Sequence, residues 1–489
     1  MSSTNNTKQV AWVAIGSSFS FAFAILSSMI LSRYFNKDDY GTYQQVLYIY
    51  HTLLSVFTLG LPKAYSYFLP RVRNNEAKDV INKINHLFFI LGGAFSLVLY
   101  VNSPFIAQFM KNDELARALR IFSPVPFLML PTMGLEGVLA TYKKSHSLAV
   151  YTFVTRLALL VCVTFPVVFM HGTYTHAIVG FTISSCISFG MALFLKYYPV
   201  RGYDHEKSSL TYLEIFRFSL PLLVASIWGI LINSTDQFFI SRYFGKKTYA
   251  EFANGGLEFP IASLLISACS TVMTPLFARQ VKEGGDFSKS ILPVWQATIS
   301  KSVMIIYPLL ILCIFEAPSI MEILYGRNYI NSSGFFRIKQ VVNFVKIMPY
   351  APMIIALGSV RFYSMSMMMA FIGLAASEYV SILLFDNPYC LVLIHTLCII
   401  LLSSALILHI AIKINIKIKS LIPSRIIFKV AMASLFALGA ILAMDKVLML
   451  RNLYWKVMAD GCVYFSVYGI FCVFSKIDYM ALLRPLTSK

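Results

Sequence analysis

Successive long apolar runs constrain the fold of this chain more than any other feature of its sequence. A helix needs about 20 apolar residues to cross the hydrocarbon core of a bilayer. No interval between the runs is long enough for a separate soluble domain. We therefore predict an all-α polytopic membrane protein with about 14 transmembrane helices. They lie near residues 10–31, 42–60, 84–101, 118–140, 148–170, 175–195, 217–241, 250–277, 299–316, 337–358, 362–385, 389–411, 427–447 and 454–475.

The composition agrees with a lipid-covered surface. Charged residues make up only 13% of the chain, whereas soluble domains carry about 25%. The net charge is +19, but Lys and Arg lie mostly in short turns between apolar runs, so nucleic-acid binding is excluded. The run 10–31 is too long for a signal-peptide core and no cleavage pattern follows it, so we expect it to be a retained helix.

The distribution of positive charge predicts the orientation. With the N-terminus inside, the inner loops hold 25 of the 41 Lys and Arg residues and the outer loops hold 14. The remaining two, Arg156 and Lys346, lie within predicted helices. Because positive residues concentrate in cytoplasmic loops, we expect both termini in the cytoplasm.

A short motif recurs at the end of the first and seventh runs. Ser32–Phe35 reads Ser-Arg-Tyr-Phe and recurs as Ser241–Phe244, and two looser matches follow in the same order. Such a repeat indicates two six-helix halves, which are parallel because six is even. We predict an N-terminal lobe (1–200), a C-terminal lobe (210–412) and two additional helices (420–480), with a substrate cleft at the repeat interface.

Ionisable side chains inside transmembrane helices are costly and are functional candidates. Arg156 lies eight residues into its run from the cytoplasmic side, where a guanidinium would suit a diphosphate. The alternatives are snorkelling to the headgroups or pairing with Glu136. The full set of candidates is Glu136, Arg156, Asp236, Glu258, Lys346 and Glu378.

Four of these candidates lie in the outer half of the second lobe. Lys346 and Glu378 are at similar depth on sequential antiparallel helices, which predicts an ion pair of structural or functional kind. The carboxylates of Asp236 and Glu258 are candidates for proton or ion exchange. For Asp236 the alternative is a cap or a pair with Arg242 near the surface.

The sequence carries no catalytic, nucleotide-binding or cofactor motif, so we expect neither an enzyme nor a cofactor. All eight cysteines lie in apolar runs without a CxxC pattern, which favours packing over disulfides or zinc. His171 and His176 share a short loop without an acidic or Cys partner, so we expect no metal site there.

Several degenerate motifs carry a resemblance to a known family. They are Leu31–Phe35 with Asp39–Tyr43, Leu59–Pro62, Phe218–Pro221, Ser234–Ile240, Tyr249–Phe252, Glu258–Pro260 with Pro275, Leu324–Gly326 with Tyr329, and Phe336–Ile338. With these motifs the chain resembles the polysaccharide-biosynthesis (Wzx-type) flippases of the multidrug/oligosaccharidyl-lipid/polysaccharide exporter superfamily. The resemblance spans most of the first twelve predicted helices.

The resemblance implies two six-helix lobes around a cationic cavity in the bacterial inner membrane. It implies alternating access, driven by an ion gradient or the membrane potential, that moves an undecaprenyl-diphosphate-linked oligosaccharide to the periplasmic face for O-antigen, capsule or exopolysaccharide assembly. A polysaccharide polymerase and other assembly proteins are implied partners. Arg156 and Lys346 would then attract the diphosphate or acidic sugars, and Asp236, Glu258, Glu378 and Glu136 would serve ion coupling or gating.

Two rival functions stay open at this point. A cation-coupled multidrug exporter of the same superfamily would need a compact acidic ion site, and acidic residues are sparse here. A multipass polysaccharide polymerase or acyltransferase would carry catalytic residues on a sizeable external loop, whereas the predicted outer loops are short.

Overall fold

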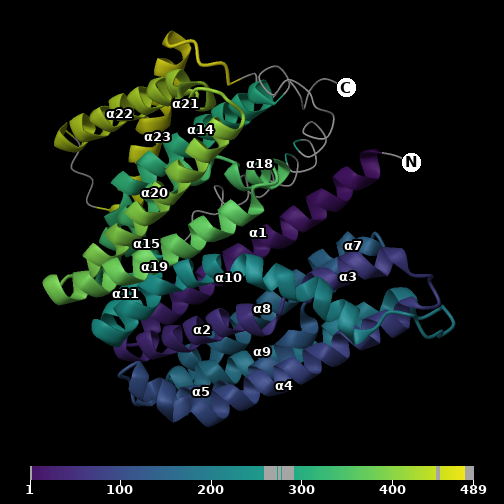
Figure 1. Cartoon of the computed structure of the whole chain (residues 1–489). Coiled ribbons are helices and arrows are strands. Elements are labelled where there is room, and N and C mark those ends of the chain that lie inside the picture. Colours follow the sequence, from purple (N-terminus) through teal and green to yellow (C-terminus); the bar gives the residue numbers. More distant parts are fainter. Residues whose placement is uncertain (1–2, 258–272, 274–276, 278–290, 448–451, 480–489) are drawn as a thin grey trace. The chain divides into compact units, whose positions relative to one another are not determined.

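The computed structural model describes residues 3–257, 273, 277, 291–447 and 452–479 (Figure 1), and helices are the only regular secondary structure in those residues. The chain divides into two compact units, residues 1–250 and 251–489. The predicted all-α class is confirmed. The predicted lobe limits, 1–200, 210–412 and 420–480, stay predictions.

The first unit contains the first seven predicted runs. Its α-helices and 3₁₀ helices (η) are α1 (Ser3–Tyr34), α2 (Lys37–Phe57), α3 (Pro62–Phe68), η1 (Leu69–Arg71), α4 (Ala77–Phe109), α5 (Glu114–Phe122), α6 (Pro124–Met129), η2 (Leu130–Thr132), α7 (Leu135–Thr141), α8 (Ser145–Phe169), α9 (Tyr174–Tyr197), η3 (Tyr198–Val200) and α10 (Tyr212–Tyr243). Helix α11 (Gly245–Gly255) spans the boundary between the units in sequence.

The second unit contains the later runs. Its helices are α14 (Leu292–Phe315), α15 (Ala317–Tyr325), η4 (Arg327–Tyr329), α16 (Ser332–Val341), α17 (Asn343–Lys346), α18 (Tyr350–Ala356), α19 (Val360–Leu384), α20 (Pro388–Lys413), α21 (Ile418–Leu421), α22 (Ser424–Val447) and α23 (Leu453–Phe474). Most of the eighth predicted run, 250–277, lies outside the described residues.

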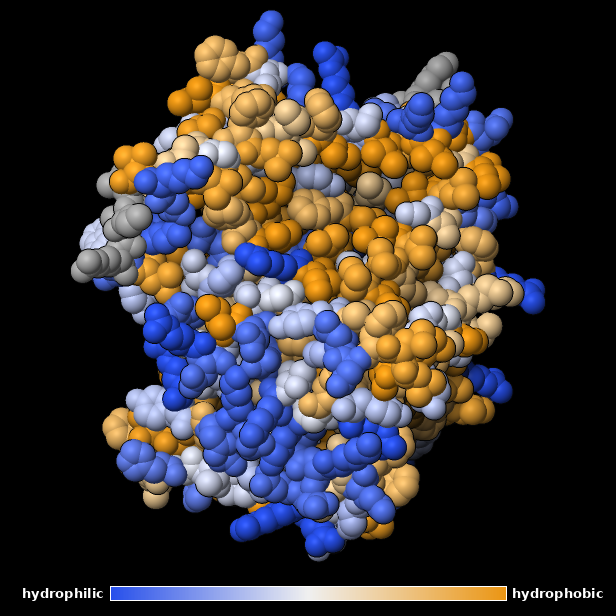
Figure 2. Space-filling view, turned by 90° about the vertical axis from the view of Figure 1, so that its left-hand side faces the viewer, coloured by the Kyte–Doolittle hydropathy of each residue, from blue (hydrophilic) through white to orange (hydrophobic). Residues whose placement is uncertain are grey.

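Ten of the described spans are long and apolar enough to cross a membrane. The number rises to 11 if the bent pair Tyr212–Val224 and Ser226–Tyr243 counts as one span. The chain is therefore a multi-pass membrane protein, and the predicted count of 14 is not reached within the described residues. Apolar side chains also cover much of the face seen in Figure 2, and on α4 the exposed Leu97, Val101 and Phe105 illustrate such a surface.

Two predicted helices are broken. The run 118–140 forms α5, α6, η2 and α7, and the run 337–358 forms parts of α16, α17 and α18. Pro124, Pro126 and Pro131 lie in the first break, and proline cannot donate the helical N–H bond. Gly134 then turns the chain with a φ of 75°, a conformation that suits glycine. Both breaks occupy the fourth place of a predicted six-helix half, and the repeat itself stays a prediction.

Helix α8 packs between α1 and α9 in the first unit. The contact with α9 is tight at Gly180, where an added Cβ would lie 2.0 Å from the carbonyl oxygen of Cys162. On the α1 side, an added Cβ on Gly16 would lie 3.4 Å from the Cα of Ala149. Small residues thus let these three helices approach, as is common in membranes.

In the second unit, α14, α22 and α23 share a buried core. The indole of Trp295 is fully buried and donates a 2.9 Å hydrogen bond to the carbonyl of Leu421. The hydroxyl of Tyr464 on α23 donates a 2.9 Å bond to the carbonyl of Pro308 on α14. The last two helices therefore pack on α14.

Candidate functional site

A polar cavity lies inside the first unit, between α1, α7, α8 and α9. It consists of two pockets of about 480 and 320 Å³ that share Glu136, Leu148, Thr152 and Arg156. The larger pocket adds residues of α1, and the smaller one adds residues of η2 and α9. We call the two pockets together the polar cavity.

Arg156 lies deeper in the membrane than its place in the predicted run 148–170 indicates. Helix α8 begins at Ser145, so Arg156 is near its middle, about 16–20 Å along the axis from either end. The hydrocarbon core is about 30 Å thick, so both headgroup layers are beyond the length of the side chain. This depth disfavours the snorkelling alternative.

The guanidinium of Arg156 makes no hydrogen bond or ion pair within the part of the chain that the structure describes. Its charge acts on Tyr50, His51 and Tyr151 nearby. Glu136 lines both pockets but forms no ion pair with Arg156 among the described residues. Both charged groups are therefore accessible to a ligand in the polar cavity.

Hydroxyl groups line part of the wall, beside apolar side chains. Four of them donate to carbonyls of their own helices or turns: Thr132 to Met129 at 2.7 Å, Thr152 to Leu148 at 2.9 Å, Thr155 to Tyr151 at 2.8 Å and Ser185 to Phe181 at 2.8 Å. Because their protons are used internally, these oxygens offer lone pairs to the cavity. The wall is thus rich in acceptors, and Arg156 supplies five N–H donors.

A buried lysine supports the broken helix beside the cavity. Lys196 on α9 is fully buried, and its Nζ donates to the carbonyls of Pro131 and Met133 at 2.8 and 2.7 Å. It also lies 3.0 Å from both the Tyr65 hydroxyl and the Asn85 Oδ1. These bonds hold the backbone just before α7, which carries Glu136. We did not predict this role, because Lys196 follows the run 175–195 and reads as a loop residue.

The other predicted site residues do not line the polar cavity. Asp236 is fully buried on α10, where its Oδ1 accepts a 2.8 Å bond from the amide of Gln237. In the second unit, Glu378 is fully buried on α19, and Lys346 is half-buried at the end of α17. The predicted ion pair between Lys346 and Glu378 stays a prediction, and Glu258 lies outside the described residues.

A second set of buried charges was missed. Asp460 on α23 is fully buried, and its carboxyl interacts with that of Glu316 electrostatically and through a side-chain hydrogen bond. Nearby, Lys456 pairs with Asp445 at 3.0 Å. Asp460 lies inside the predicted run 454–475, so the rule for intramembrane charges would have found it.

No group of three or more His, Cys, Asp or Glu side chains could hold a metal ion within the described ranges. His176 instead caps α9, because its Nδ1 accepts a 3.2 Å bond from the amide of Thr173. The thiols of the cysteines that the structure describes are free.

The sequence matches one family model, described as polysaccharide biosynthesis protein, over residues 30–334. The comparison with curated proteins gives no significant match.

The fold is similar to those of several solved transporters. The lipid II flippase MurJ in an inward closed conformation superposes with a TM-score of 0.70 at 14% identity, covering 96% of this chain and 99% of MurJ. An inward-facing multidrug resistance MATE family transporter of the MOP superfamily gives 0.68 at 12% identity, covering 83% and 98%. A MOP superfamily transporter from Pyrococcus furiosus gives 0.58 at 14% identity, covering 84% and 95%.

Proposed function

Because the chain belongs to the polysaccharide biosynthesis protein family of the multidrug/oligosaccharidyl-lipid/polysaccharide exporter superfamily, we propose that it is a flippase for a lipid-linked oligosaccharide. It moves an undecaprenyl-diphosphate-linked repeat unit from the cytoplasmic to the periplasmic leaflet of the bacterial inner membrane. The product feeds assembly of a surface polysaccharide, together with a polymerase and other assembly proteins. Both termini of the chain are cytoplasmic in this proposal.

The accessible guanidinium of Arg156 in a hydroxyl-lined cavity carries this proposal. A planar guanidinium binds phosphate oxygens through two parallel N–H bonds, which makes it suited to a diphosphate in a low-dielectric site. The acceptor oxygens of Thr152 and Thr155 suit sugar hydroxyl groups, which are hydrogen-bond donors. One cavity thus offers groups for both the charged and the sugar portions of the substrate.

The size of the polar cavity supports binding of a substrate headgroup rather than of a single ion. Its pockets of about 480 and 320 Å³ compare with small-molecule sites, which measure about 300–1,000 Å³. The polyprenyl chain needs no place in such a cavity, because the exposed apolar faces of the helices allow it to stay in the bilayer.

The remaining ionisable groups have coupling roles in this proposal. Asp236, Glu258 and Glu378 exchange protons or cations during alternating access, and Glu136 gates access to Arg156 in the cavity that they share. Lys346 attracts an acidic sugar or the diphosphate in the second lobe. The protein performs no bond chemistry and uses no cofactor.

A flipping assay tests the proposal. Full-length protein is reconstituted in liposomes with a fluorescent polyprenyl-diphosphate-linked oligosaccharide, and a membrane-impermeant quencher reports its sidedness. We expect translocation that is lost in Arg156→Gln and kept in Arg201→Gln, which changes an exposed arginine of a loop. Equal translocation by Arg156→Gln would remove Arg156 from the mechanism.

The same liposomes separate the rival functions. Transport of a cationic dye without transport of the lipid-linked sugar would identify a multidrug exporter.

A deletion strain separates a flippase from a polymerase. In such a strain, a flippase defect leaves lipid-linked repeat units facing the cytoplasm. Repeat units that accumulate on the periplasmic face instead would identify a polymerase.

A further inference from the structure

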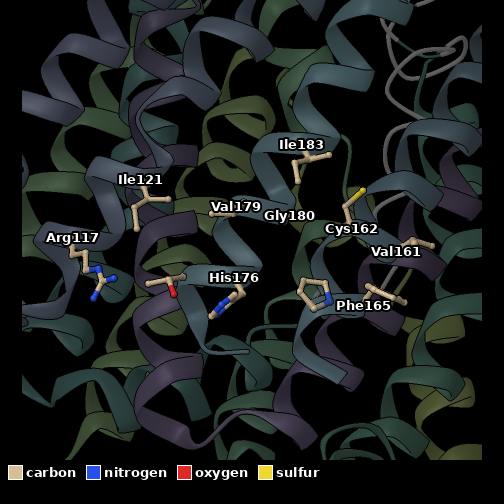
Figure 3. Close-up of a pocket in the computed structure, with 11 residues that line it drawn as sticks. Arg117, Ile121, Val161, Cys162, Phe165, His176, Val179, Gly180 and Ile183 are labelled. Carbon is tan, nitrogen blue, oxygen red and sulfur yellow. The ribbon is translucent and has the colours of Figure 1, made fainter. Parts of the chain in front are cut away.

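A second cavity of about 530 Å³ runs along α9, with α5 on one side and α8 on the other (Figure 3). We call it the lateral groove. Its lining includes Arg117 of α5, Val161 and Phe165 of α8, and His176, Val179 and Ile183 of α9. Arg117 is its charged member, His176 and the thiol of Cys162 are its titratable members, and most of the remaining lining is apolar.

The apolar walls of the lateral groove face outward. Val161 is 50% exposed, Phe165 53%, Val179 46% and Ile183 52%. All four lie within helices that qualify as membrane spans, so this surface contacts hydrocarbon rather than water. An apolar ligand can therefore enter the groove from the bilayer.

The polar end of the groove is at headgroup level. Arg117 and His176 lie in the first turns of spans that begin at Glu114 and Tyr174. From His176 to Ile183 the groove follows α9 for about 10 Å toward the membrane interior. The lining of the groove is thus cationic at headgroup level and apolar toward the membrane interior. A lipid is arranged in the same order, from headgroup to acyl chain.

The side chains at this end are available for an anion. Arg117 has no hydrogen bond or ion pair within the described chain, and the nearby Glu114 is bound by Lys246 at 2.8 Å. The Nδ1 of His176 accepts the amide proton of Thr173, so its Nε2 carries the proton and is a donor. Arg117 and His176 therefore each offer an N–H donor at the same end of the groove.

The lateral groove and the polar cavity use different faces of α9. The groove takes Val179, Gly180 and Ile183, whereas the cavity takes Ser184, Ser185 and Ser188. The two sets are offset by five residues, which is about 140° around a helix with 3.6 residues per turn. A ligand in the groove therefore lies outside the polar cavity.

We propose that the lateral groove is a binding site for an anionic glycerophospholipid of the surrounding membrane. The phosphate accepts hydrogen bonds from Arg117 and from Nε2 of His176, and one acyl chain lies along Val179 and Ile183. A water-soluble phosphate has no group to fill the apolar part of the groove. The bound lipid supports the contact between α8 and α9, which also form the wall of the polar cavity.

Photolabelling tests this site with the full-length protein in nanodiscs. The probe is phosphatidylglycerol with a diazirine in one acyl chain, and diacylglycerol with the same chain is the control. We expect saturable labelling of residues 161–183 by phosphatidylglycerol only. Arg117→Gln should weaken binding about tenfold, which is the loss of one charge-assisted hydrogen bond. Arg201→Gln should leave it unchanged.

Blocking the groove gives an independent measurement. Val179→Trp and Ile183→Trp place an indole in the groove from an exposed position, and each should abolish labelling while the protein stays monodisperse and helical. Equal labelling by diacylglycerol, or full labelling of both Trp variants, would overturn the proposal. So would competition by inorganic phosphate, or displacement by polyprenyl phosphate at lower concentration than by phosphatidylglycerol.

Discussion

The Nζ of Lys196 lies 2.7 Å from the carbonyl oxygen of Met133, at the break between η2 and α7. This ammonium is fully buried, and its hydrogen-bond partners in the described chain are two backbone carbonyls, a phenol and an amide rather than a carboxylate. Backbone carbonyls freed by a broken helix need donors inside a membrane. Lys196 supplies them and thereby fixes the start of the helix that carries Glu136.

Lys196→Met should destabilise the first unit. It keeps an apolar chain of similar length but leaves the carbonyls of Pro131 and Met133 without donors, at a cost of about 3 kcal/mol. Thermal unfolding in detergent measures this loss. Lys63→Met, at an exposed position, is the matched control and should unfold like the wild type. An unchanged unfolding temperature for Lys196→Met would contradict the support role.

Arg156→Lys tests the geometry of the guanidinium separately from its charge. An ammonium cannot form the paired bonds of a guanidinium, so we expect about tenfold weaker apparent affinity for the lipid-linked oligosaccharide. The unfolding temperature should not change, because Arg156 has no partner in the described chain. Liposome flipping rates against substrate concentration give the affinity, and a wild-type curve would mean that only charge matters.

Lys246 should make the first unit sensitive to high pH. Burial lowers its pKa, but the hydrogen bond that Lys246 donates to Glu114 and the charges of Glu114, Asp38 and Asp39 outweigh burial, so the pKa is raised above 10.5. The pairing is therefore fully present below pH 10.5 and is lost as pH rises through the folded pKa. The pair contributes about 0.5 kcal/mol, since it is partly exposed.

The measurement for Lys246 compares unfolding temperatures between about pH 9 and pH 11.5. The wild type should lose more stability over this range than Lys246→Met, which has no proton to lose. Lys247→Met serves as the control, because Lys247 is mostly exposed and pairs only with Asp38 among the described acids. Identical pH slopes for wild type and Lys246→Met would contradict the prediction.

Asp460→Asn should stabilise the second unit. The carboxyl group is fully buried, and the neighbour that it meets electrostatically and by a side-chain hydrogen bond is a second carboxyl, that of Glu316. A neutral amide of the same shape avoids the cost of a buried charge beside another carboxyl, a gain of about 1 kcal/mol. Asp386→Asn, in an exposed loop, is the control. A lower unfolding temperature for Asp460→Asn would show that the ionised form is required, for example by Lys456.

Two glycines of α9 should respond in opposite directions to alanine. At Gly180 the added Cβ meets the carbonyl oxygen of Cys162 at 2.0 Å, so Gly180→Ala must push α8 and α9 apart. At Gly190 no atom lies within 4 Å, so Gly190→Ala should stabilise the helix by about 0.5–1 kcal/mol. Unfolding temperatures of the two variants give the comparison, and equal values would rule out a tight helix contact at Gly180.

Apolar run length predicted the class of fold and the places of most helices, because a bilayer demands long uninterrupted apolar segments. It did not predict the breaks in runs 118–140 and 337–358. A proline in an apolar run bends one helix and breaks another, depending on donors such as Lys196 that come from distant sequence. The lobe limits follow from a repeat in the sequence and stay untested.

The candidate site shows the same division between local and distant information. Arg156 was found because an arginine within an apolar run is rare, and its run also contains the hydroxyl residues that line the cavity beside it. Its nearness to Glu136 depends on the turn at Gly134, which no local pattern specified. Lys196 was missed because burial of a residue at the end of a run depends on which helices cover it.

The position of Arg156 at the middle of α8 has an electrical consequence. A charge that crosses the whole membrane gains about 2.3 kcal/mol per 100 mV. An anionic group that reaches the guanidinium from one surface has therefore crossed about half of this field, which is about 1.2 kcal/mol per charge at 100 mV. For a headgroup with two charges, the voltage across the membrane would therefore change the occupancy of the cavity. The occupancy on loading from one membrane face would differ from that on loading from the other by more than tenfold.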